Sequence, residues 1–151
     1  MTKGELAKQN FLGGLNCSQA VLCAFCDQTG LDGQSAAQLS SAFGAGIGGQ
    51  REVCGALSGM LMAFGLIRGG YRCGDTAEKA AYYAQVRELC DRFRAENGSI
   101  ICREILGLDK NAVYAGPSER TPEYYKKRPC PDKAASAAQI LSDYLAQTQE
   151  K

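Results

Sequence analysis

The chain has 151 residues, of which 45% are hydrophobic and 22% are charged, and its formal net charge is +1. This length suits a single domain covering residues 1–151, and the composition is typical of a soluble globular protein. The small net charge argues against nucleic acid or an anionic membrane as the main partner.

The hydrophobic periodicity of the chain is helical, and the alternation typical of strands is missing. The first helix is expected from Lys3 to Leu12, ending at Gly13-Gly14. Asn16 and Gln19 form a capping-box pattern at the start of a second helix, which Gly30 ends. The apolar face of this second helix has five members: Cys17, Ala20, Val21, Ala24 and Phe25.

Two further helices are expected on either side of a glycine-rich stretch. Ser35 to Phe43 forms a short helix that leads into GAGIGG, and Val53 begins a central, mostly buried helix that ends at Gly69-Gly70. Asp75 and Glu78 form another capping-box pattern. The helix that follows them ends near Asn97-Gly98 and carries one apolar stripe: Tyr82, Val86, Leu89 and Phe93.

The last third of the chain is predicted to begin with a short helix from its cap Ser99 to Leu106, stopped by Gly107. All four prolines lie between Pro117 and Pro131, which predicts an irregular segment. Pro131 suits the first position of a final helix, whose core positions are Ala134, Ala137, Ala138, Leu141, Tyr144 and Leu145. Together these elements predict an all-α, single-domain bundle of about five or six helices.

The N-terminal stretch MTKGELAKQN is polar and lacks the apolar core of a signal peptide. The most apolar run extends from Val53 to Ile67, which is shorter than the roughly 20 residues that a membrane span requires. We therefore expect a cytoplasmic protein without a membrane partner. Structural disulfides are rare in the cytosol, so the eight cysteines predict metal binding or redox chemistry. The chain has no histidine, which excludes histidine-assisted nucleophiles, histidine-ligated haem and mixed Cys/His zinc sites.

Four cysteines lie at the predicted starts of helices: Cys17, Cys54, Cys102 and Cys130. Backbone N–H groups and the helix dipole stabilise a thiolate at such a position, and the thiolate is the form that binds metal or attacks disulfides. Arg51, Arg103 and Arg128 are close in sequence to three of these cysteines. We hypothesise that the four converge as metal ligands. The alternative is that each is an ordinary buried cysteine that packs as a small hydrophobe.

The other four cysteines are interpreted differently. Cys90 shares a helix stripe with Val86 and Phe93, so we expect it to be buried without a sulfur or metal partner. Cys23 and Cys26 form a C-x-x-C inside a predicted helix, without the βα context of a thioredoxin motif, and are interpreted as packing or partly exposed thiols. Cys73 lies in a predicted loop, and no role is assigned to it.

The glycine-rich stretch GAGIGG formally matches the G-x-G-x-x-G of dinucleotide sites. That motif needs a preceding strand, whereas the preceding SAAQLSSAF looks helical, and the P-loop lysine is missing. The four-residue spacings of Gly44 with Gly48 and of Gly55 with Gly59 favour close helix packing. In addition, the backbone at Gly48, Gly49 and Gly55 is expected to approach a cofactor held by Cys54 and to donate hydrogen bonds to sulfur.

Four segments in this order resemble the family of redox-active proteins named for its C-GCAxxG-C-C pattern: NCSQAV at Cys17, CGALSG at Cys54, ICREILG at Cys102, and Cys130 before the terminal helix. The resemblance extends over about Phe11 to Leu145. One departure is that the chain reads V-C-G-A-L-S-G rather than a strict G-C-A. The resemblance implies a small helical protein with redox-active cysteines, which in related domains fused to a cytochrome are thought to hold an iron–sulfur cluster.

Three functions follow from these observations. The first is electron transfer to a redox partner protein through an iron–sulfur cluster held by the four cysteines, since four thiolates suit a [2Fe–2S] or [4Fe–4S] cluster. The second is a thiol–disulfide oxidoreductase or redox sensor that uses two of the same cysteines. The third is a non-enzymatic helical module with zinc or no cofactor, although Cys₄ zinc sites usually consist of two closely spaced pairs.

Overall fold

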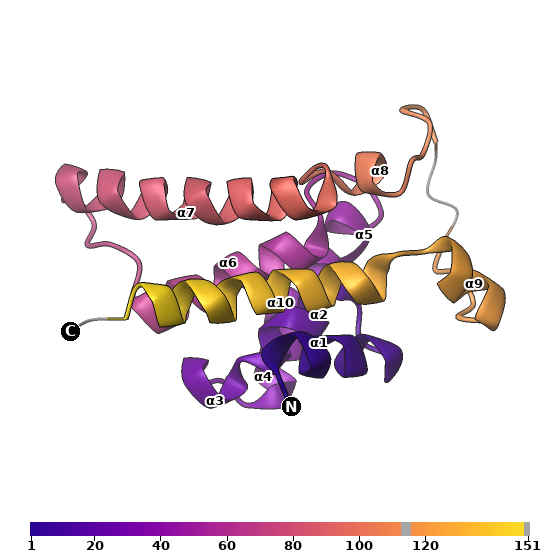
Figure 1. Ribbon diagram of the computed structural model, residues 1–151, viewed down its shortest axis with the longest axis horizontal. Coiled ribbons are helices and arrows are strands. Elements are labelled where there is room, and N and C mark those ends of the chain that lie inside the picture. Colours follow the sequence, from indigo (N-terminus) through magenta and orange to yellow (C-terminus); the bar gives the residue numbers. More distant parts are fainter. Residues whose placement is uncertain (113–115, 150–151) are drawn as a thin grey trace.

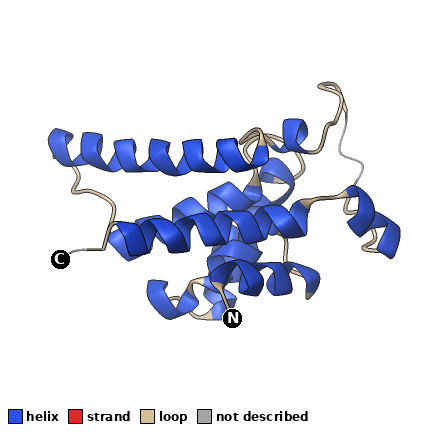
Figure 2. Cartoon of the chain, in the orientation of Figure 1, coloured by secondary structure: helices blue, strands red, loops and turns tan. Residues whose placement is uncertain are grey.

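The computed structural model describes residues 1–112 and 116–149, and within these ranges every element is a helix (Figure 2). Six helices have eight residues or more: α1 (Lys3–Leu12), α2 (Cys17–Ala24), α4 (Gly33–Ser40), α6 (Gly55–Arg68), α7 (Thr76–Asn97) and α10 (Cys130–Gln147). The predicted all-α class is confirmed. The helix count is higher than predicted because short helices lie between the long ones.

The short helices cluster in the connecting segments. They are α3 (Cys26–Thr29), the 3₁₀ helix η1 (Ser41–Phe43), α5 (Gly44–Ile47), α8 (Cys102–Ile105) and α9 (Pro122–Lys127). The prediction that the proline-containing segment is irregular is wrong over α9, where the Thr121 side chain accepts from the Tyr124 N–H and Pro122 occupies the first turn. A proline is favoured there because the first helical N–H groups have no intrahelical partner.

Several helix ends follow the local sequence signals. Asn16 and Gln19 exchange both capping-box hydrogen bonds at the start of α2. Asp75 caps α7 by accepting from the Glu78 N–H. The Glu78 carboxylate does not complete the predicted box and instead accepts from the backbone and side chain of Arg72. Glycines in the left-handed conformation end α3, α6 and α7, as predicted from Gly30, Gly69 and Gly98.

Other boundaries differ from the sequence prediction. The helix expected from Ser35 begins at Gly33, because Asp32 caps it through the Ser35 N–H. Ser99 does not cap a helix: its hydroxyl accepts from the Ile101 N–H and bonds to Glu104, and α8 begins only at Cys102. The helix expected to continue from α2 to Gly30 is interrupted at Phe25, where φ is −108° and ψ is 15°.

The core lies where α1, α2, α6 and α10 pack against one another. Figure 1 shows α10 lying between α1 and α7 in the view, with α6 and α2 nearby. Leu22 of α2 and Phe25, which follows α2, belong to this core. Helix α6 contributes Leu57, Met60 and Phe64, and all five side chains are at most 1% exposed. Helix α4 covers α2 from the other side. Packing among these helices fixes the positions of the first residues of α2, α6 and α10 relative to one another.

Helix α7 is more exposed than its predicted stripe implies. Leu89 and Phe93 are buried, whereas Tyr82 and Val86 are only half-buried. Tyr82 stacks on Phe64 with ring centroids 5.3 Å apart, so the N-terminal half of α7 is held to α6 mainly by aromatic contact. None of the helices in residues 1–112 and 116–149 combines the length and the apolar character that a membrane crossing demands.

Candidate functional site

The four cysteines predicted to share a site line one cavity of about 350 Å³. Cys17, Cys54 and Cys102 are only 7–8% exposed, and Cys130 is half-buried. The cavity lies at the end of the molecule where α5, α8 and α9 gather, seen together in Figure 1. The structure therefore brings together residues that are up to 113 positions apart (130 − 17), while their role as metal ligands stays a prediction.

Each of these cysteines stands at a helix start. Cys17, Cys102 and Cys130 are the first residues of α2, α8 and α10, and Cys54 is the residue that caps α6. In each case the main chain enters the helix at the cavity wall. The four cysteines that the sequence placed at helix starts therefore lie at four helix starts around one cavity.

Backbone pairing joins the segments that carry Cys54 and Cys102. The Cys54 N–H donates to the Ile100 carbonyl at 2.8 Å, and the Cys102 N–H donates to the Glu52 carbonyl at 2.6 Å. Val53 and Ile101 form an isolated antiparallel bridge between these two bonds. This short ladder fixes the position of the brief helix α8, which has too few residues to be stable alone.

Two glycines of α6 allow α2 to approach closely. A Cβ atom on Gly55 would collide with the Cys17 sulfur, and one on Gly59 would lie 2.5 Å from the Ser18 carbonyl oxygen. The close packing predicted from the Gly55 and Gly59 spacing is present. The spacing of Gly44 and Gly48 does not create such a helix contact. A Cβ on Gly44 would meet the Asn16 side chain, whereas a Cβ on Gly48 would meet nothing closer than the Ala42 carbonyl oxygen at 4.0 Å.

The glycine loop forms one wall of the cavity, and Gly48, Gly49 and Gly55 all line it. Three non-glycine residues of this loop adopt the left-handed conformation: Ala45, Ile47 and Arg51, with φ of 54°, 69° and 61°. Such conformations are costly for residues with a Cβ and concentrate at functional sites. Burial raises the pKa of the Cys17 thiol, and a hydrogen bond from the Ala45 backbone of this loop opposes that effect.

Burial controls the protonation of the thiols. It raises the pKa of Cys17, and it raises the pKa of Cys54 and of Cys130 to about 12. The nearby Cys17 contributes to the raised pKa of both Cys54 and Cys130. The expectation that helix starts hold these cysteines as thiolates is therefore wrong for these three in the metal-free protein, because loss of hydration outweighs the backbone hydrogen bonds.

Alkaline pH is expected to destabilise the fold through these thiols. The folded protein keeps the Cys54 proton up to a pKa of about 12, whereas an ordinary thiol loses its proton near 9. The unfolded chain therefore binds fewer protons in this window, and the free energy of unfolding falls by about 1 kcal/mol per pH unit for this group. Urea denaturation between pH 8 and 10.5 should show a shallower decline for Cys54→Ala than for the unaltered protein. If the stability of both proteins declined equally with pH, the raised pKa would not belong to Cys54.

The cysteine side chains that the structure describes are not preassembled as a site for a single metal ion. A Cys₄ zinc site holds each sulfur about 2.3 Å from one ion, and hence places the sulfurs roughly 3.8 Å apart. Within the described part of the chain, no three cysteine, aspartate or glutamate side chains are arranged to hold one metal ion. The four cysteines instead line one cavity.

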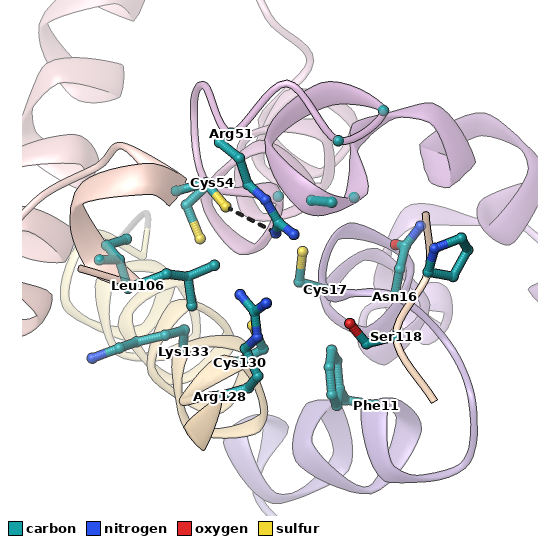
Figure 3. Close-up of a pocket in the computed structure, with 18 of the residues that line it drawn as sticks. Phe11, Asn16, Cys17, Arg51, Cys54, Leu106, Ser118, Arg128, Cys130 and Lys133 are labelled. Carbon is teal, nitrogen blue, oxygen red and sulfur yellow. Dashed lines mark hydrogen bonds between the residues drawn. The ribbon is translucent and has the colours of Figure 1, made fainter. Parts of the chain in front are cut away.

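Only two of the three arginines suggested by sequence proximity reach the site. Figure 3 shows Arg51 and Arg128 extending into the cavity from opposite sides. Arg51 Nη1 donates to the Cys102 sulfur at 3.8 Å. Arg103 turns away and donates to the carbonyls of Gln50, Asp109 and Ala112.

Residues shortly before α10 and in its first turn also line the cavity, although no sequence pattern predicted this. Ser118, Arg120 and Tyr124 line the cavity, and Lys133 lies on its wall in the first turn of α10. Arg120 donates to the Phe11 and Leu15 carbonyls at 2.5 and 3.0 Å and stacks on the Phe11 ring. No sequence motif marks these residues, although the excess of charged and aromatic residues among the prolines was a usable signal.

The remaining cysteines lie outside the cavity, and all eight are free thiols. Cys73 is exposed, as expected for a loop. Cys23 and Cys26 are partly exposed and lie within hydrogen-bonding range of each other, but on either side of the break at Phe25 rather than inside one helix. Cys90 packs against the core but is half-buried, so the prediction of full burial is wrong.

Replacing Cys90 with alanine is expected to cost roughly 1 kcal/mol of stability, because a partly buried thiol contributes no more than a small hydrophobe. Chemical denaturation measures this loss. The same variant should keep any metal or redox activity of the protein at the level of the unaltered chain. Loss of that activity would show that the cysteines had been assigned to the wrong groups.

Comparison with known proteins assigns the chain to a family. A family model described as "Putative redox-active protein (C_GCAxxG_C_C)" matches residues 15–144, a span that contains all four cavity cysteines. No curated protein and no solved structure matches the chain. The match covers well over half of the sequence and agrees with the resemblance predicted from the order of the cysteine motifs, so this chain belongs to the C_GCAxxG_C_C family of redox-active proteins.

Proposed function

We propose that this protein transfers electrons through an iron–sulfur cluster held by Cys17, Cys54, Cys102 and Cys130. The observation that supports this most strongly is their convergence on one cavity from four separate helix starts. Bound there, the cluster would supply one-electron transfer. The family assignment supports redox activity in general.

The residues around the thiols suit such a group. Gly48, Gly49 and Gly55 give the cavity a wall of backbone, from which N–H groups can donate to sulfur. Arg51 and Arg128 place positive charge among the thiols, which favours thiolate ligands and the negative charge they confer on a bound group. Phe11 and Leu106 add apolar surface to the lining.

A second candidate is thiol–disulfide exchange by a pair of the same cysteines. It is favoured by one observation: the cavity cysteines are all free thiols that influence one another electrostatically, with Cys17 and Cys102 each affecting both Cys54 and Cys130. In this reaction two thiols form a disulfide and pass two electrons and two protons to a partner disulfide, which becomes two thiols. Either function requires a redox partner protein.

Anaerobic purification followed by iron, zinc and sulfide analysis and a visible spectrum tests the proposal. We expect iron and acid-labile sulfide in comparable amounts and a visible absorption that bleaches on reduction. A colourless, sulfide-free protein would overturn the cluster. In that case, a reversible two-electron titration of the cavity thiols would establish the second candidate.

A further inference from the structure

The charged side chains on the cavity wall are all basic. Arg51, Arg120, Arg128 and Lys133 line it, and no aspartate or glutamate of the described residues does. This concentration of positive charge occurs in a protein whose formal net charge is only +1. Phe11, Ile105 and Leu106 supply apolar walls, and a cleft of low polarity strengthens the field of the charges that line it.

Arg120 and Lys133 have secondary roles at the cavity. Both guanidinium Nη atoms of Arg120 are engaged by the Phe11 and Leu15 carbonyls, so this arginine ties the segment before α9 to the end of α1. Figure 3 shows the Lys133 ammonium directed away from the thiols, toward the rim. Figure 3 shows Arg51 and Arg128 extending into the cavity where the cysteines lie.

Arg51 and Arg128 extend into the cavity from different elements. Arg51 belongs to the glycine loop, where its left-handed backbone directs the side chain toward Cys102. Arg128 precedes α10, and its guanidinium forms no hydrogen bond or ion pair with any residue that the structure describes. Figure 3 shows its guanidinium directed into the cavity that Cys130 also lines.

Two guanidinium groups that face one space form a recognisable anion-binding arrangement. Each is permanently charged and presents planar pairs of N–H donors that match the oxygens of a carboxylate, sulfonate or phosphate. We propose that the cavity binds a small oxyanion between Arg51 and Arg128, beside the thiols of the site. This inference rests on the proposed function and deepens it, because it names the class of small molecule that comes into contact with the redox centre.

Sulfate and inorganic phosphate are suitable probes, and the metal-free, reduced protein is the starting material. Backbone amide NMR shifts are followed during titration with each anion, with sodium chloride adjusted to keep the ionic strength constant. We expect the amide signals of Gly48, Gly49 and Cys130 to shift in a saturable way as sulfate or phosphate is added. Sodium chloride alone should not produce these shifts. Arg128→Gln is expected to weaken binding at least tenfold, and Arg128→Lys less, because lysine keeps the charge but loses the planar donors.

Arg94→Gln is the matched control, since Arg94 is a surface arginine paired with Asp91 and remote from the cavity. It should bind as the unaltered protein does. If Arg128→Gln failed to fold, Lys133→Gln, at the rim, should still weaken binding, by a smaller factor. Equal binding by the unaltered protein and Arg128→Gln, or no saturable shift, would overturn the oxyanion site. Because metal-free protein is used, that failure leaves the iron and sulfide analysis unaffected.

Discussion

Serine at Cys17, Cys54, Cys102 or Cys130 is expected to lower the iron and sulfide content of anaerobically prepared protein at least tenfold. A serine hydroxyl does not ionise at neutral pH, whereas the thiolate is the ligand that iron–sulfur clusters require. All four side chains line the same cavity, so the loss of any one opens the ligand set. Metal and sulfide analysis of each variant, normalised to protein, measures the effect.

Cys26→Ser is the matched control for this series, because Cys26 is a partly exposed thiol that does not line the cavity. Its iron and sulfide content should equal that of the unaltered protein. A cavity variant that kept its full iron content would remove that cysteine from the ligand set. An equal loss in Cys26→Ser would show that the series reports oxidation or misfolding rather than ligation.

Alanine at Gly59 is expected to lower the free energy of unfolding by about 3 kcal/mol, since overpacking of a tight core contact is costly. The added Cβ would lie 2.5 Å from the Ser18 carbonyl oxygen, which is backbone and cannot rotate away. Helix α2 also cannot shift freely, because the buried Ser18 hydroxyl donates to the Ser40 carbonyl at 2.7 Å. Urea denaturation with circular dichroism at 222 nm measures the loss.

Gly33→Ala provides the comparison for Gly59→Ala. Gly33 is the first residue of α4, and a Cβ there would meet open space. Its variant should be as stable as the unaltered chain, or about 0.5 kcal/mol more stable through the reduced freedom of the unfolded state. If both alanine variants had the same stability, the close contact between α2 and α6 would not be a determinant of the fold.

Local hydrogen bonding explains why much of the helical framework could be predicted. Asn16 with Gln19, Asp75, and the glycines after α3, α6 and α7 act on residues three to five positions away, which the sequence displays directly. The packing glycines Gly55 and Gly59 were also recognisable, because their four-residue spacing places them on one helix face. The interruption at Phe25 could not be predicted, since it lacks a proline or glycine.

The four cysteines were chosen because they lie at predicted helix starts and follow the order of the motifs. These are the cysteines that line the cavity. The sequence by itself determined where α2 and α7 begin, because capping at Asn16 and Asp75 depends on near neighbours. Only the tertiary structure decided that four such starts meet, that burial raises the pKa of Cys17, Cys54 and Cys130, and that Arg128 faces the thiols while Arg103 turns away. Solvation and side-chain direction depend on elements packed from distant parts of the chain, and no local pattern encodes them.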